Sequence, residues 1–343
     1  MNSAKSAKPL LFSQLQKAIK QGDIESCCHW VAYIDIMNLQ EHLWEKLILY
    51  CSKYIHIHNP KLPLLLHKKI QQFKDVEKTM NAHDEIWKNH SIRRNWCQLM
   101  FVIVGSKKGI VYTLPNSNTF NVAVLDTIDL HPIVLRKRRS DDSSFIQKMI
   151  SMILTTPLFS EKLTYLHIMY KLESSSQFPY HCSSRPFLSV ESKYNHDWIW
   201  LLWECILEKA ILENVNAYEI IISLQYLFCY RYQSSKKYGR YPLVVHALLL
   251  CEDNKNVLFH QNVFSMCDQS LILKACNNID SIYDEILMSS TLTQPPSTTS
   301  LPPPTTPPTT QISSSSSSSS SGSPHPITFE YLDSLFLSNQ KNI

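Results

Sequence analysis

The chain has 343 residues, of which 44% are hydrophobic and 18% are charged, a balance that excludes a wholly disordered protein. Its length accommodates one large or two modest domains. Only 5 residues are glycine, which argues against Gly-rich phosphate loops and many tight hairpins. The formal net charge of +4 is mildly basic; it permits nucleic-acid binding without indicating it.

The N-terminal sequence MNSAKSAKPLLFSQLQ lacks the apolar core of a secretory signal. Apolar runs such as 198–203 and 247–251 are too short to span a bilayer. The ten cysteines mostly lie within apolar helical patterns, no C-x-x-C occurs, and a disulfide framework is not expected in so long a chain. We therefore expect a soluble, intracellular protein without a membrane partner.

Helical spacing of apolar residues predicts helices in the first half of the chain, over 11–19, 24–36, 41–55, 62–73 and 96–104. Gly22-Asp23 separates the first two, and Asn59-Pro60 ends the third because the residue before proline disfavours the helical region. Residues 110–134 are richer in β-branched side chains and predict a short β-hairpin. A charged loop follows at 136–144 and marks a predicted domain boundary.

The second half predicts helices over 145–154, 160–172, 198–212, 217–232, 242–251 and 270–288. The expected fold is therefore mostly α, with a helical domain over 10–135, the loop at 136–144 and a second helical domain over 145–288. Residues 289–328, rich in Pro, Thr and Ser, predict a disordered linker, and 329–337 predict a short helix-forming peptide. The similarity of 41–49 to 195–203 is explained either by a duplicated helical unit or by chance between Trp-containing helices.

Residues 15–60 carry a pattern that is found in a known family. Lys17-Ala-Ile-Lys-Gln-Gly-Asp23 is followed by Cys28-His-Trp-Val-Ala-Tyr33 and by the sixteen residues Glu45 to Pro60. In this order the segment resembles the C-terminal helical domain of the replication-associated recombination ATPases, the RarA or Werner-helicase-interacting family. The resemblance extends in weaker form to 93–108. It implies a helical assembly domain that supports oligomerisation.

This sequence departs from the family pattern at two points. The acidic pair and the glycine of the family's E-D-I-G are replaced by Lys53, Tyr54 and His56, so whatever those acids do in the family cannot be done here. The ATPase module is missing, because no G-x-x-x-x-G-K-[ST] occurs in the chain. The resemblance therefore implies an assembly domain without a motor.

Three clusters contain residue types that are found in catalytic or metal sites, but the spacing of each argues against such a site. His56 and His58 could ligate a metal with Cys51, but their spacing suits a strand and no further ligand lies nearby in sequence. Cys27-Cys28-His29 places a thiol beside an imidazole, but adjacent side chains on a helix diverge by about 100°. His83-Asp84-Glu85 contains the H-x-E of zinc deaminases without the P-C-x-x-C that must follow. We expect no catalytic residue, no metal and no cofactor.

The densest basic cluster is formed by Arg136, Lys137, Arg138 and Arg139. Four cations on a loop can engage an importin's acidic groove or a phosphate backbone, and they can also be solvated surface. Asp141 and Asp142 beside Ser140 oppose phosphate contact and suit a regulated import signal. The hypothesis for this cluster is nuclear import, with phosphate contact as the alternative.

The C-terminal segment 329–337 is the most distinctive feature. On a helix, Phe329, Leu332, Leu335 and Phe336 would share one face. So short a helix is marginal alone and would order in the groove of a protein partner. It could instead fold back and cap the chain's own helical body.

The sequence therefore predicts a non-enzymatic assembly or adaptor protein of DNA replication or repair. Its helical body would dock or self-associate and its C-terminal peptide would recruit a protein partner, with DNA binding allowed but not required. The alternative is a transcriptional regulator that uses the same tail as an acidic-hydrophobic activation motif. The basic cluster at 136–139 predicts a nuclear location, with a viral replication compartment as the alternative. The richness in Ile, Asn, Lys and Ser suggests an AT-rich genome, which large DNA viruses and some protists have.

Overall fold

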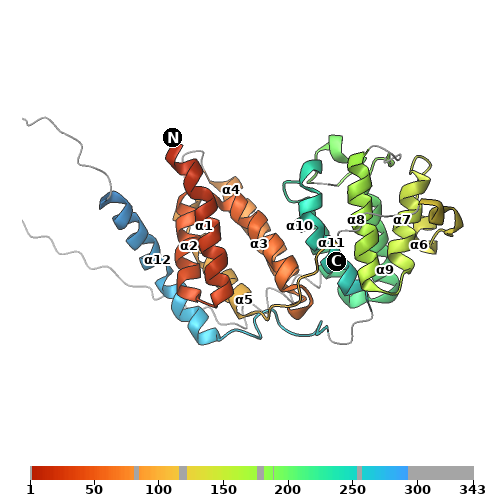
Figure 1. Cartoon of the computed structure of the whole chain (residues 1–343). Coiled ribbons are helices and arrows are strands. Elements are labelled where there is room, and N and C mark those ends of the chain that lie inside the picture. Colours follow the sequence, from red (N-terminus) through yellow and green to blue (C-terminus); the bar gives the residue numbers. More distant parts are fainter. Residues whose placement is uncertain are drawn as a thin grey trace, which may run out of the picture. The chain divides into compact units, whose positions relative to one another are not determined.

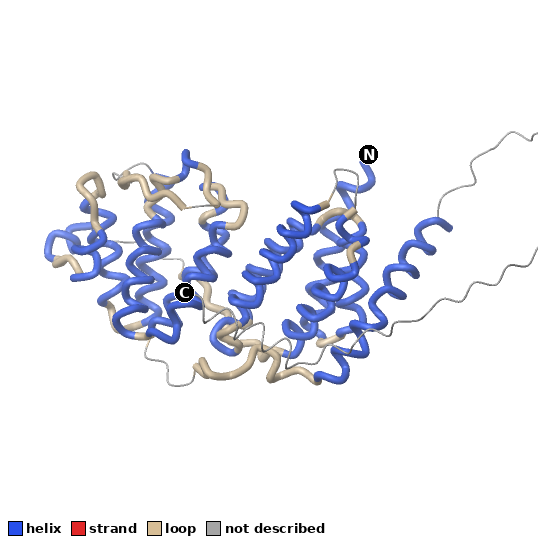
Figure 2. Tube along the Cα trace, turned by 180° about the vertical axis from the view of Figure 1, so that it is seen from behind, coloured by secondary structure: helices blue, strands red, loops and turns tan. Residues whose placement is uncertain are grey.

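The computed structural model describes residues 2–80, 85–115, 122–175, 181–187, 189–252 and 257–292. These residues form α-helices joined by loops and short 3-10 turns, and no strand occurs among them (Figure 1, Figure 2). The prediction of a mostly α fold is confirmed. The disordered linker predicted over 289–328 is wrong for its first four residues, because 289–292 belong to a helix that ends at Leu292. The rest of the linker, 293–328, and the peptide at 329–337 lie outside the described residues.

Twelve α-helices are present in the described residues. They are α1 (Asn2–Gln21), α2 (Ile24–Ile36), α3 (Gln40–Tyr54), α4 (Leu62–Thr79), α5 (His90–Gly105), α6 (Pro132–Lys137), α7 (Ser144–Thr155), α8 (Phe159–Ser175), α9 (Ile199–Glu213), α10 (Val215–Cys229), α11 (Tyr241–Cys251) and α12 (Gln269–Leu292).

Local sequence signals fix where several helices begin and end. Gly22 follows α1 with φ +74°, a backbone conformation that glycine adopts without steric cost. Asp23 then starts α2, where its carboxylate accepts a hydrogen bond from the Ser26 amide at 3.0 Å. Proline stands in the first turn of α4, α6 and α11, where its missing N–H costs nothing.

The predicted β-hairpin within 110–134 is wrong for the residues that the structure describes. Residues 111–115 are irregular, Val122–Thr127 forms a 3-10 helix and Pro132 begins α6. Leu125, Ile133 and Val134 are buried. Their burial explains the β-branched composition without a strand, because intrinsic β-propensity is largely a preference for packed surfaces.

Helices from the two ends of the chain pack together. Helix α12 lies against α2 and α5 of the N-terminal half. The Tyr283 hydroxyl donates to the buried Asp35 Oδ2 at 2.7 Å, and Arg93 Nη1 lies 2.8 Å from Asp280 Oδ1. Burial raises the pKa of Asp35 to about 6.

A second contact joins α4 to α10. The rings of His67 and Tyr226 stack at 3.8 Å, and the Ser223 hydroxyl lies 3.2 Å from His67 Nδ1. Residues 1–294 form one compact unit, and the predicted boundary at 136–144 lies inside it. The remaining unit, 295–343, lies outside the described residues.

Aromatic side chains and thiols fill the core. Five tryptophans are almost fully buried: Trp44, Trp96, Trp198, Trp200 and Trp203. Trp44 and Trp96 bring α3 against α5 with ring centroids 4.3 Å apart. All ten cysteines are free thiols, and all but Cys267 are buried, as expected for thiols that pack as small apolar side chains.

Candidate functional site: a lysine-rimmed apolar groove

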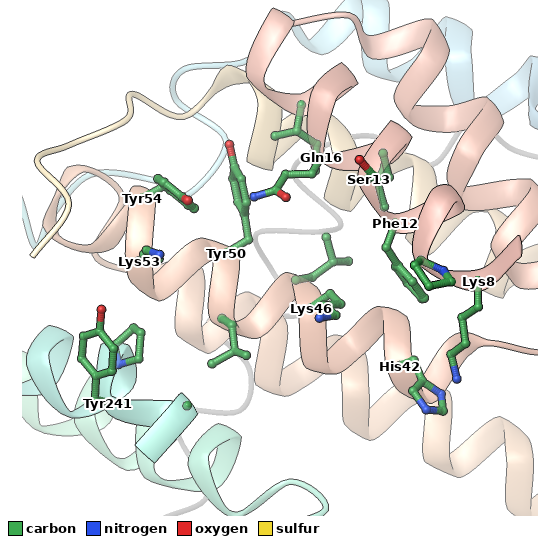
Figure 3. A pocket seen from close by; sticks show the side chains of 17 residues that line it. Lys8, Phe12, Ser13, Gln16, His42, Lys46, Tyr50, Lys53, Tyr54 and Tyr241 are labelled. Carbon is green, nitrogen blue, oxygen red and sulfur yellow. The ribbon is translucent and has the colours of Figure 1, made fainter. Parts of the chain in front are cut away.

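A cavity of about 690 Å³ lies between α1, α3 and the first turn of α11 (Figure 3). We call it the α1–α3 groove. Its lining residues are Lys8, Pro9, Phe12, Ser13, Leu15, Gln16, Ile19, His42, Lys46, Leu47, Leu49, Tyr50, Lys53, Tyr54, Gly239, Tyr241 and Pro242. Its volume lies within the range of about 300–1,000 Å³ that is typical of ligand pockets.

Helical spacing builds the two long walls of the groove. From α1 it is lined by residues 8, 9, 12, 13, 15, 16 and 19, and from α3 by residues 42, 46, 47, 49, 50, 53 and 54. Both sets recur every three or four positions, which places each on one helix face. The faces meet because α1 and α3 both pack beside α2.

The floor of the groove is apolar and its upper walls are aromatic. Leu15, Ile19 and Leu47 are buried beneath it, whereas Phe12 and Tyr54 are only half-buried. Half-buried aromatic rings with an apolar floor supply contact area to a ligand at little conformational cost. The groove can therefore receive apolar side chains from outside.

The rim of the groove is positively charged. Lys8, Lys46 and Lys53 line it, and no lining residue is acidic. Among the described residues, no carboxylate forms an ion pair with any of these three lysines. The pKa of His42 is lowered by burial first and then by the charges of Lys8 and Arg231, whereas Glu45 and Glu41 act to raise it.

The carboxylate nearest to these lysines in sequence faces another side of α3. Glu45 lines a second cavity of about 210 Å³ against α10 and α11, which shares Lys46, Leu49 and Gly239 with the groove. Its Oε1 lies 2.7 Å from Lys236 Nζ and 3.4 Å from Arg240 Nη2. Its carboxylate is thus paired with Lys236 and Arg240 and forms no ion pair with a groove lysine, although its charge acts to raise the pKa of His42 in the groove.

The basic cluster predicted at 136–139 is largely paired. Arg136 Nε and Lys137 Nζ lie 3.1 and 2.9 Å from the two carboxylate oxygens of Glu208 on α9. Arg139 Nη2 lies 3.2 Å from Glu204 Oε1. Arg138 is exposed. A cavity of about 410 Å³ at this cluster is lined by both signs of charge.

A buried ion-pair network contacts this cluster, because Glu204 pairs with both Arg139 and Arg185. The Arg185 guanidinium is 1% exposed and lies 2.6 Å from Asp142 Oδ2 and 2.8 Å from Glu204 Oε2. Burial acts to raise the pKa of Asp142, but hydrogen bonds from Arg185 and from two backbone amides hold it below its ordinary value. The acidic residue that the sequence analysis placed in a surface loop is therefore a buried structural partner.

The histidine pair at 56 and 58 lies at the end of α3 beside the loop at 109–110. The ring centroids of His56 and His58 are 5.6 Å apart, and His56 Nε2 lies 2.9 Å from the Ile110 carbonyl. Gly109 is required there, since an added Cβ would come within 2.5 Å of the His56 ring. In the residues that the structure describes, no three or more His, Cys, Asp or Glu side chains are grouped to hold a metal ion.

The thiol at position 27 is not poised for nucleophilic attack. Burial raises the pKa of Cys27 to about 12, so the thiol is protonated at neutral pH. His29 is exposed and its ring contacts Trp30 edge-on at 5.3 Å. The adjacent imidazole and thiol therefore diverge, as the helical geometry predicts.

Two sets of sequence candidates lie outside the described residues. One is His83-Asp84 of the H-x-E motif. The other is the peptide face formed by Phe329, Leu332, Leu335 and Phe336.

The sequence analysis missed the α1–α3 groove. A usable signal was present, because lysines and aromatic residues recur at helical spacing in both 8–19 and 42–54. Each of these two sets, taken alone, is typical of a solvent-exposed amphipathic helix. That the two sets line one cavity follows only from the packing of α1 and α3 beside α2.

The chain gave no match to protein-family models, to curated proteins or to solved structures. Within the described ranges, no helix is both long and apolar enough to cross a membrane. The chemistry of the groove must accordingly be judged from its own residues.

Proposed function

We propose that this chain is a non-enzymatic adaptor whose α1–α3 groove binds an acidic, amphipathic segment of a partner protein. The observation that carries this proposal is an apolar, aromatic-walled groove rimmed by Lys8, Lys46 and Lys53 with no acidic lining residue. Apolar side chains of such a segment would fill the floor, and its carboxylates would lie against the lysines. Helix-in-groove recognition needs this combination of contacts.

DNA replication or repair is the setting that we propose for this adaptor. The support is the resemblance of residues 15–60 to the helical domain of the replication-associated recombination ATPases. Where that family carries an acidic pair, this chain carries Lys53 and Tyr54, and both line the groove. The departure from the family thus changes the sign of charge at the site, which suits an acidic ligand.

Two further parts of the adaptor hypothesis rest on the sequence. Self-association of the helical body follows from the family resemblance. The proposed nuclear location depends on Arg136, Lys137, Arg138 and Arg139 as an import signal, and the viral-compartment alternative depends on the composition of the chain. Three of these cations pair with α9 carboxylates. Use as an import signal would therefore require these exposed pairs to open, at a cost of about 1 kcal/mol or less each.

Fluorescence anisotropy with labelled synthetic peptides tests the groove directly. The probes are fifteen-residue amphipathic peptides that present four apolar residues on one face and carry either acidic or basic residues on the other. We expect the acidic peptides to bind the full chain with micromolar affinity that weakens with salt, because surface charge attraction is screened. The basic peptides should not bind.

A charge-reversal variant makes this test specific. In the variant that combines Lys46→Glu with Lys53→Glu, the preference should switch from acidic to basic peptides. Lys274→Glu is the matched control, since this exposed lysine lies on α12, away from the groove. Binding of acidic and basic peptides alike, or a preference that ignores the reversal, would contradict the proposed function.

A further inference from the structure

A segment of this chain has the chemistry that the α1–α3 groove selects. Residues 329–337 carry the apolar side chains Phe329, Leu332, Leu335 and Phe336 together with two acids, Glu330 and Asp333. No Asp, Glu, Lys or Arg occurs between Glu285 and Glu330. The two acids are therefore the first charged side chains after Glu285, Lys341 is the next, and large apolar residues flank them.

The groove offers the complementary surface. Its rim carries three lysines and no carboxylate, and its floor is formed by buried leucine and isoleucine. On a helix, four apolar residues of the segment would share one face while Glu330 and Asp333 lie elsewhere. Such a face directed at the floor would leave the acids near the lysine rim.

The connection between the segment and the groove is long enough. Between Leu292 at the end of α12 and Phe329, 36 residues intervene. Helix α12 packs on α2, and α2 packs on α1, so the groove wall lies about 20 Å from α12 at ordinary helix spacing. A chain of this length can span up to about 120 Å.

The same tether raises the local concentration of the segment. A linker of a few tens of residues holds a tethered ligand at an effective concentration of order 1 mM. An intrinsic dissociation constant of only about 100 μM would then leave the groove mostly occupied, in a ratio of about 10 to 1.

The cavity beside Arg136 and Arg139 is a poorer match for the segment. Glu204 and Glu208 line that cavity and pair with its cations. An acidic segment placed there would have to displace carboxylates that are already in contact with the arginines. The lysines of the α1–α3 groove have no such competitor among the described residues.

We propose that residues 329–337 bind the α1–α3 groove of their own chain and compete there with the acidic segment of a partner. The proposal rests on the proposed function, because both assign the same ligand chemistry to the groove. It gives the tail a second role, as an internal competitor that a partner must displace. The tail would then occupy the groove until a partner of sufficient affinity displaces it.

Photo-crosslinking in the full chain locates the segment. Phe336 is replaced by p-benzoylphenylalanine, the chain is irradiated at low concentration and the cross-linked peptides are identified by mass spectrometry. We expect links within one chain to peptides that contain residues 8–19 or 46–54. Links to 204–218, links only between copies, or no links would each overturn the proposal.

Charge exchange tests whether the acids and the lysines pair. Lys46→Glu combined with Lys53→Glu should reduce the intrachain cross-link at least fivefold. Adding Glu330→Lys and Asp333→Lys to that variant should restore it, and Lys274→Glu should have no effect. A loss that the compensating changes do not rescue would overturn the charge pairing on which the proposal depends.

Competition separates failure of this inference from failure of the proposed function. In the full chain with Leu332→Asp and Phe336→Asp, the labelled acidic peptide should bind about tenfold more tightly than to the unchanged chain. Equal affinity for both chains would overturn the proposal that the tail competes for the groove. The proposal that the groove binds acidic amphipathic segments would still stand. Absence of binding to both chains would instead overturn the proposed function.

Discussion

Two groups of cations on this molecule differ in what surrounds them. Arg136, Lys137 and Arg139 each contact a carboxylate of α9, and Arg185 beneath them is buried against Asp142. The three lysines of the α1–α3 groove stand over an apolar floor with no acidic lining residue. Similar basic residues thus occupy a balanced structural network in one place and an uncompensated rim in the other.

The comparison shows why charge density along the sequence is a poor guide to a binding surface. The cluster at 136–139 is the densest basic run, yet most of its charge is balanced within the fold. The groove lysines are spread over 8–53 and form no recognisable sequence motif. A ligand responds to the net field at a surface, which depends on the carboxylates that folding brings close.

Loss of the buried arginine should produce the largest effect. We expect Arg185→Ala to lower the free energy of unfolding by about 3–5 kcal/mol, because the fully buried Asp142 would lose its guanidinium partner. Urea denaturation monitored by circular dichroism measures this change. Arg139→Ala is the matched control, since this half-exposed pair should cost at most about 1 kcal/mol. Equal effects of the two substitutions would remove the distinction between buried and surface pairs.

Acidification should weaken the fold through buried histidines that carry no proton. His246 is buried, neither of its ring nitrogens has a hydrogen-bond partner in the described residues, and burial lowers its pKa well below the ordinary value. The unfolded chain binds a proton below about pH 6.5 whereas the folded chain does not. Stability is thus fully present above that pH and falls as pH decreases, by roughly 1.4 kcal/mol per pH unit for this group.

A substitution identifies the contribution of His246. Denaturation curves measured between pH 7.5 and 5 give the free energy of unfolding at each pH. In His246→Leu this free energy should depend on pH less steeply than in the unchanged chain, by the contribution of one proton. An unchanged slope in His246→Leu would show that position 246 does not resist protonation.

Removal of a groove lysine should have the smallest effect on stability. Lys46 is exposed and makes no ion pair among the described residues, so Lys46→Ala should change the free energy of unfolding by less than about 0.5 kcal/mol. The same substitution should weaken binding of the acidic peptides severalfold. Destabilisation comparable to that of Arg185→Ala would mean that the groove lysines stabilise the fold. It would contradict the difference between them and the paired cations at α9.

The helices were largely predictable because their signals are local. Gly22-Asp23, Asn59-Pro60 and the apolar spacing of 24–36 and 41–55 placed the end of α1 and both ends of α2 and α3 within a few residues, whereas α1 begins at Asn2, nine positions before the predicted start. The hairpin prediction failed where β-branched residues of 122–134 pack as 3-10 and α-helical turns. Burial against neighbouring elements decided the secondary structure of that segment, and burial cannot be inferred from a short stretch of sequence.

By itself, the sequence determined the helical class, the helix ends and the composition change after residue 289, since each depends on neighbours within a few positions. Tertiary structure decided which helices meet: α12 returns to α2 and α5, and α1 and α3 face each other across the groove. It also decided which charges are paired, because Asp142 meets Arg185 across 43 positions of the chain. Electrostatic pairing and cavity formation depend on distances in space, and these arise only when remote segments bury their apolar faces together.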